Sequence, residues 1–80
     1  MLFGDYVGHV RDPIHIRVYA RGGKLYARIA GEVCRLEYCE QTVFAAISEE
    51  SGKRVNFLRF FIHDGRAWAV KCGSLLYHRV

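Results

Sequence analysis

The chain has 80 residues, of which 51% are hydrophobic and 25% are charged, and its formal net charge is +4. This length predicts one domain over residues 1–80, and the balance of apolar and charged residues excludes a disordered tail. No apolar run is long enough for a membrane helix and no secretory leader opens the chain, so we expect a cytoplasmic protein without a membrane partner.

Residues 1–13 predict little regular structure. The alternation over residues 6–10, Tyr-Val-Gly-His-Val, is compatible with an edge strand. Asp12-Pro13 ends that strand, because proline removes a backbone donor and cannot continue a helix. No function is assigned to this segment.

A β-hairpin is predicted over residues 14–21 and 24–30. Gly22-Gly23 supplies the positive φ angles that a two-residue hairpin loop needs. With this turn, Tyr19 faces Tyr26 and Arg17 faces Arg28. Because side chains alternate along a strand, one face faces the core; it holds Ile16, Val18, Ala20, Leu25, Ala27 and Ile29. The other face holds Arg17, Tyr19, Arg21, Lys24, Tyr26 and Arg28.

The charge on this second face favours an anionic partner. No acidic residue occurs between Ile14 and Ala30. Like charges directly opposite each other cost some tenths of a kcal/mol per pair, which a bound anion would relieve. A face on which the arginines extend into water is the alternative.

A single helix is predicted over about residues 38–51. Cys39, Val43, Ala46 and Ile47 share one helical stripe, while Glu40, Gln41, Ser48 and Glu49 point outward. Gly52 follows as the residue that ends the helix. Before it, Gly31 marks a bulge or bend, and residues 33–36 either continue the preceding strand or begin the helix.

A second hairpin is predicted around Asp64-Gly65, a strong two-residue turn signal. In the simplest register His63 faces Arg66, and the facing pairs continue as Ile62 with Ala67, Phe61 with Trp68, Phe60 with Ala69 and Arg59 with Val70. The core face then holds Leu58, Phe60, Ile62, Ala67 and Ala69. The outer face holds Phe57, Arg59, Phe61, His63, Arg66, Trp68, Val70 and Cys72.

The remaining features are less specific. Residues 74–80 are apolar enough for a last strand or a dimer contact. The three cysteines, Cys34, Cys39 and Cys72, match no zinc-site spacing and are expected to be buried small hydrophobes, with no metal and no cofactor. The only side-chain amides, Asn56 and Gln41, give a compositional hint of a thermophile.

The predicted fold class is α+β, a four-stranded mainly antiparallel sheet with one helix on its apolar face. The uncovered face would bring both hairpins' aromatic and cationic side chains together. Base stacking on such rings contributes about 1–3 kcal/mol per base with little sequence preference, which predicts binding of single-stranded DNA or RNA. The predicted contact residues are Arg17, Tyr19, Arg21, Lys24, Tyr26, Arg28, Phe57, Arg59, Phe61, Arg66 and Trp68.

This order of elements resembles the archaeal ThermoDBP-related single-stranded DNA-binding proteins. The resemblance covers residues 14–72 and depends on the hairpin–helix–hairpin order and on the interleaved aromatic and arginine residues, which are Tyr19, Tyr26, Phe61 and Trp68 among Arg17, Arg28, Arg59 and Arg66. It implies a sheet-lined aromatic and basic cleft for single-stranded DNA, and an oligomer. A heptad zipper, by which the founding members of that family dimerise, is absent from this sequence.

Two alternatives remain open. Phe57, Phe61 and Trp68 also suit the centre of a homodimer interface, because aromatic residues are enriched there. Residues 59–77 resemble the strands of RelE-type ribonuclease toxins, which would make His63 a proton donor and Arg66 a phosphate clamp. The hairpin at residues 14–30 replaces the two N-terminal helices of that fold, and no nucleophile elbow, phosphate loop or carboxylate pair occurs. We therefore do not expect an enzyme.

Overall fold

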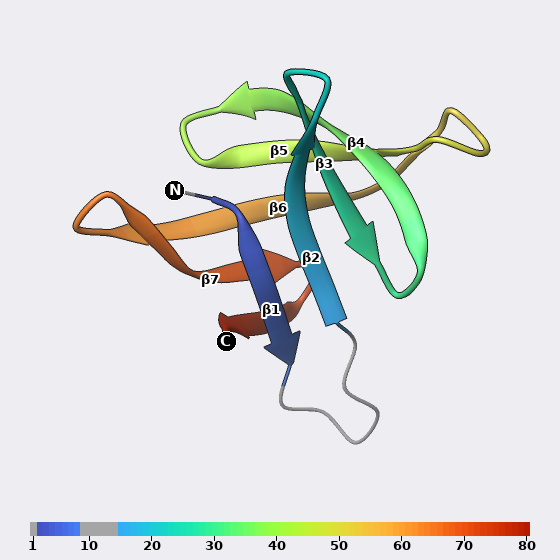
Figure 1. Ribbon diagram of the computed structural model, residues 1–80. Coiled ribbons are helices and arrows are strands. Elements are labelled where there is room, and N and C mark those ends of the chain that lie inside the picture. Colours follow the sequence, from blue (N-terminus) through green and yellow to red (C-terminus); the bar gives the residue numbers. More distant parts are fainter. Residues whose placement is uncertain (1, 9–14) are drawn as a thin grey trace.

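The computed structural model describes residues 2–8 and 15–80, which form eight β-strands (Figure 1). The strands are β1 (Gly4–Gly8), β2 (His15–Arg21), β3 (Lys24–Ile29), β4 (Glu32–Glu40), β5 (Val43–Ser48), β6 (Arg54–His63), β7 (Arg66–Cys72) and β8 (Leu75–Arg79). No helix occurs in the described residues, so the α+β prediction of a four-stranded sheet beneath a helix is wrong. The fold is all-β.

The eight strands close into an antiparallel barrel. Each strand pairs with the one that follows it in the chain, and β8 pairs with β1. The strand expected over residues 6–10 is confirmed for residues 6–8, which belong to β1, but its position at an edge is wrong, because β1 has a partner on both sides. His9, Val10 and Asp12-Pro13 lie outside the described residues. Residues 74–80 were predicted to form either a last strand or a dimer contact, and they supply the strand β8.

The first hairpin has the predicted register. Arg17 lies opposite Arg28, Tyr19 opposite Tyr26 and Arg21 opposite Lys24. Gly22 and Gly23 have φ angles of 58° and 78°, as a two-residue turn requires. Of the predicted core face, Ile16, Val18 and Ala27 are buried and Leu25 and Ile29 pack against the core, while Ala20 near the turn is exposed.

The predicted helix over residues 38–51 is instead the end of β4, a turn at residues 41–42, and β5. The helical spacing of Cys39, Val43, Ala46 and Ile47 was coincidental, and β5 itself holds Val43, Phe44 and Ile47, which are β-branched or aromatic residues that favour strands. Ser48, expected to point outward, is buried and accepts a hydrogen bond from the backbone N–H of Ser51 at 3.3 Å. Ala30 and Gly31 form the turn between β3 and β4 rather than a bulge.

The second hairpin has the predicted turn but not the predicted register. His63 lies opposite Arg66 and Ile62 opposite Ala67, after which a β-bulge shifts the pairing. Beyond the bulge Phe61 pairs with Ala69 instead of Trp68, and the remaining pairs shift likewise. Trp68 is the extra residue, so the alternation of β7 shifts after Ala67, which is buried as predicted. Val70 and Cys72, which the predicted register placed outside, are therefore buried. Ile62 of β6 was expected inside and is 42% exposed, although it lies before the shift in pairing.

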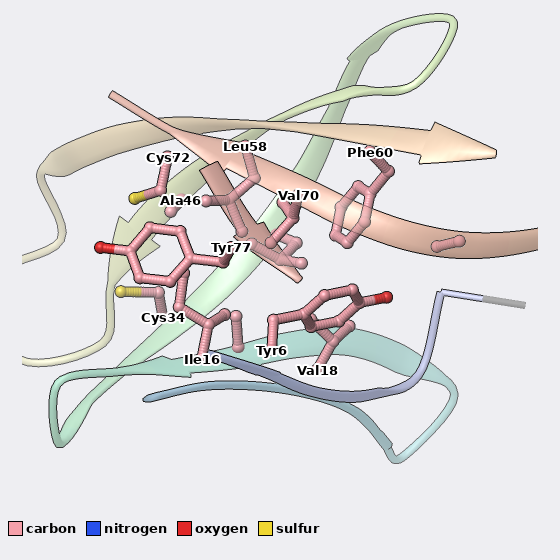
Figure 2. Close-up of a cluster of buried hydrophobic side chains, with 13 residues drawn as sticks. Tyr6, Ile16, Val18, Cys34, Ala46, Leu58, Phe60, Val70, Cys72 and Tyr77 are labelled. Carbon is pink, nitrogen blue, oxygen red and sulfur yellow. The ribbon is translucent and has the colours of Figure 1, made fainter. Parts of the chain in front are cut away.

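One hydrophobic core fills the space between the walls of the barrel. Figure 2 shows Leu58, Phe60 and Val70, from β6 and β7, pointing toward Ile16 and Val18 of β2. All five are at most 2% exposed. The β2–β3 wall and the β6–β7 wall thus share a core and direct their other side chains away from each other.

Tyr6 of β1 joins the two walls within this core. Its ring meets that of Phe60 edge to face, with centroids 6.0 Å apart. Its hydroxyl donates a hydrogen bond to the carbonyl oxygen of Leu2 at 2.6 Å, which satisfies the buried polar group. Burial raises the pKa of this hydroxyl, while Arg79 has a smaller, lowering effect.

Candidate nucleic-acid interface

The outer face of β2 and β3 carries a stacked pair of tyrosines between cationic side chains. The rings of Tyr19 and Tyr26 lie 5.9 Å apart between centroids, with their planes 17° from parallel, and both side chains are half-buried. Arg17 and Arg28 flank the tyrosines on one side, and a hollow of about 400 Å³ is lined by Arg17, Tyr19 and Arg28. We call the six residues Arg17, Tyr19, Arg21, Lys24, Tyr26 and Arg28 the hairpin face.

The cations of the hairpin face are mostly unpaired. Arg17 contacts the carboxylate of Asp5, its partner on β1, with Nε 3.3 Å from Oδ1, and His15 reaches the same oxygen at 3.2 Å. Arg21, Lys24 and Arg28 form no ion pair with any described residue. Two like-charged pairs therefore lie directly opposite each other with one carboxylate beside them, which leaves the face strongly positive.

Arg35 of β4 lies next to the hairpin face, but its charge is paired with carboxylates. It lies opposite Tyr26, and its guanidinium contacts Glu37 at 2.7 Å and Glu49 at 3.5 Å. The hydrogen bond that its guanidinium donates to the carboxylate of Glu37 is the main cause of its raised pKa. The sequence reasoning missed Arg35, although the alternation of buried Cys34 and Leu36 around it gives the strand signal that places it outside.

The other predicted contact residues lie on the opposite wall. Trp68 of β7 is 48% exposed, and its ring lies 5.9 Å from that of Phe61 and 6.0 Å from that of His78. Phe57 and Arg59 on β6 and Arg66 on β7 are exposed as well. The expectation that both hairpins share one uncovered surface is wrong, because the core lies between them (Figure 2). The eleven residues form two separate surfaces.

His63 and Arg66 lie opposite each other beside the Asp64-Gly65 turn, as predicted. Nε2 of His63 is 3.4 Å from Oδ2 of Asp64, and both side chains are at least 80% exposed. A hollow of about 460 Å³ is lined by His63, Arg66, Ile62 and Trp68. The tip of this hairpin therefore places the exposed imidazole of His63 beside the carboxylate of Asp64.

Two of the three cysteines are buried as predicted. Cys34 and Cys72 belong to the core, and burial raises the pKa of both thiols, that of Cys34 to about 11. Cys39 is exposed, so the prediction is wrong for this residue. Among the described residues, no three histidine, cysteine or acidic side chains come together as metal ligands would.

Comparisons with family models, curated proteins and solved structures found no match to this chain. The hairpin–helix–hairpin order on which the resemblance to the ThermoDBP-related proteins depends is not found among the described residues, because β4 and β5 take the place of the helix. No helix among the described residues is long and apolar enough to cross a membrane.

Proposed function

We propose that this protein binds single-stranded DNA or RNA on the hairpin face. The observation that carries the proposal is the stacked tyrosine pair set between four cations on β2 and β3, three of which form no ion pair with any described residue. Phosphate groups would neutralise the opposed cations, while a base stacks beside the tyrosines, where the hollow lies. A duplex hides the faces of its bases and would use the cations alone.

The sequence preference of this face is expected to be low. Ring stacking accepts every base, and the side chains that the hairpin face adds to the tyrosines are all arginine or lysine. If its four cations each neutralise one phosphate, the log–log salt slope is about −3, at roughly 0.7 per contact for a single strand.

Fluorescence anisotropy with labelled oligonucleotides tests the proposal. Single-stranded DNA, single-stranded RNA and duplex are compared at two salt concentrations, with the Tyr19→Leu/Tyr26→Leu double variant and, as a matched control, Phe61→Leu/Trp68→Leu on the opposite wall. We expect single strands to bind more tightly than duplex, and the tyrosine variant alone to lose about tenfold or more in affinity. Salt-independent binding, or equal losses in both variants, would overturn the proposal.

Self-association of the protein through the β6–β7 wall and the adjoining β8 is a second candidate function. Of the nine large hydrophobic side chains that are exposed in the described part of the chain, six lie on β6, β7 and β8, namely Val55, Phe57, Ile62, Trp68, Leu75 and Leu76. A stable dimer buries about 800 Å² per partner, and such interfaces are rich in aromatic residues. Sedimentation of the protein and of Trp68→Glu tests it, because a homodimer through this wall would dissociate in the variant. A monomer at high concentration would contradict it.

A further inference from the structure

A further hollow, of about 560 Å³, opens on the outer surface of the barrel and is lined by residues far in sequence from the hairpin face. It lies where the β4–β5 turn meets β6, β7 and the turn after β7. Its lining combines two cations, a ring, a thiol and a carboxylate, which are Arg59, Lys71, Phe57, Cys39 and Glu40. We call it the Phe57 hollow.

The cations of the Phe57 hollow are opposed and unpaired. Arg59 of β6 lies directly opposite Lys71 of β7, and both side chains are exposed. Neither forms an ion pair with another described residue, although Glu40 shares the hollow. Cations on directly opposed residues repel each other, so both of them would stabilise an anion held between them.

The aromatic ring of the hollow is already covered on one side. The guanidinium carbon of Arg54 lies 4.5 Å from the centroid of Phe57, a cation–π contact. Arg54 does not line the hollow, whereas Phe57 does and is 42% exposed. We infer that the exposed part of the ring, which faces the hollow, is available to a second planar group.

A β-bulge places the thiol at the rim. The pairing of β4 with β5 shifts between Tyr38 and Glu40, so Cys39 is the extra residue. Its thiol is exposed and lies 3.7 Å from the carbonyl oxygen of Glu37. Cys39 therefore serves as a chemical reporter of whatever occupies the hollow.

We propose that the Phe57 hollow binds a small phosphorylated ligand with a planar ring, of the mononucleotide class. The ring stacks on Phe57 and the phosphate lies between Arg59 and Lys71. This site is separate from the hairpin face, and binding there does not depend on the function proposed above.

Alkylation of Cys39 by iodoacetamide, followed by intact mass, tests the proposal. Cys34 and Cys72 are buried with raised pKa values, so the first alkylation occurs at Cys39. The probes are adenosine monophosphate, adenosine and inorganic phosphate. We expect the nucleotide to slow alkylation at least fivefold, and adenosine or phosphate at the same concentration to slow it less than twofold.

Substitutions of exposed residues test where the ligand binds. The affinity of each variant for the nucleotide is measured by calorimetry, which does not depend on the reactivity of Cys39. Phe57→Leu and Lys71→Gln are each expected to weaken nucleotide binding about tenfold. Lys53→Gln, a matched loss of one exposed cation that lies outside both the hairpin face and the hollow, is expected to leave it unchanged. Equal protection by inorganic phosphate, nucleotide binding unaffected by both substitutions, or no binding by either measurement would overturn the proposal.

Discussion

Arg17 and Arg28 lie directly opposite each other across β2 and β3, on the outer face of the barrel. Only Arg17 has a carboxylate partner among the described residues, at 3.3 Å from Asp5. Two opposed guanidinium groups destabilise a strand pair, and the phosphate groups of the proposed ligand would relieve that cost. A second pair of opposed cations, Arg59 and Lys71, lies on the opposite wall.

Arg28→Glu is therefore expected to stabilise the fold and abolish oligonucleotide binding. The new carboxylate faces Arg17 and replaces a repulsion by an attraction, which contributes about 0.2–1 kcal/mol to the free energy of unfolding. Urea denaturation measures the gain and anisotropy the loss. Lys71→Glu, which faces Arg59, is the matched control: it should stabilise similarly and leave oligonucleotide affinity intact. A loss of affinity in both variants would contradict the assignment to the hairpin face.

Trp68, the only tryptophan of the chain, reports on the wall opposite the proposed interface. It is on β7, beyond the core from Tyr19 and Tyr26, and is 48% exposed. Its selectively excited fluorescence is expected to stay unchanged when a single strand binds, while the anisotropy of the labelled strand rises. Strong quenching of Trp68 at stoichiometric oligonucleotide would instead place the nucleic acid on the β6–β7 wall.

Gly8→Ala is expected to destabilise the closure of the barrel. Gly8 lies opposite Tyr77, and a Cβ atom at position 8 would come 2.9 Å from Cε2 of that buried ring. Overpacking of this kind costs about 1–3 kcal/mol of unfolding free energy. A double-mutant cycle with Tyr77→Leu isolates the clash, because the smaller side chain should reduce the cost of Gly8→Ala. An equal cost in both backgrounds would exclude the ring as its cause.

Alkaline pH is expected to destabilise the protein through Cys34. Burial, and to a lesser extent Glu32, Cys72 and Glu49, raise the pKa of this thiol from 9.0 to about 11 in the folded state. The folded state therefore favours the neutral thiol. The contribution of this thiol to the free energy of unfolding is complete below pH 9 and is lost as the pH rises from about 9 to 11.

Denaturation of the wild type and Cys34→Ala across that range measures the effect. The difference between their unfolding free energies should narrow by at most roughly 1.4 kcal/mol per pH unit. The raised pKa values of Cys72, Tyr6 and Tyr77 act in the same direction in both proteins and so cancel in the comparison. A constant difference from pH 8 to pH 11 would show that Cys34 does not titrate differently on folding.

The hairpin face was predictable because its register is local. Gly22-Gly23 fixes the turn, and alternation then places every side chain of both strands. The second hairpin has an equally strong turn at Asp64-Gly65, but its bulge lies beyond Ile62, where nothing in the alternation marks it. The prediction was therefore correct at His63 and Arg66 and one residue out of step from Phe61 onward.

The arrangement of the two surfaces was not predictable once residues 38–51 were assigned to a helix. With that segment as a helix, four strands leave one face of a sheet open, and both hairpins share it. As strands, β4 and β5 complete a ring of eight, and a twisted sheet of that size closes on itself. Val43 and Ile47 fit a helical stripe and a strand equally well, and only their β-branched side chains favoured the strand.

The pairing of β1 with β8 is the only ladder in the described barrel that joins strands distant in sequence. It continues beyond the strands, since the backbone N–H of Val80 donates a hydrogen bond to the carbonyl oxygen of Asp5 at 2.9 Å. A circular permutant, joined by a short linker from β8 to β1 and opened within Gly22-Gly23, would keep all eight ladders. The contact that closes the ring would then become a local hairpin, and Tyr19 would meet Tyr26 only when the two new ends of the chain come together.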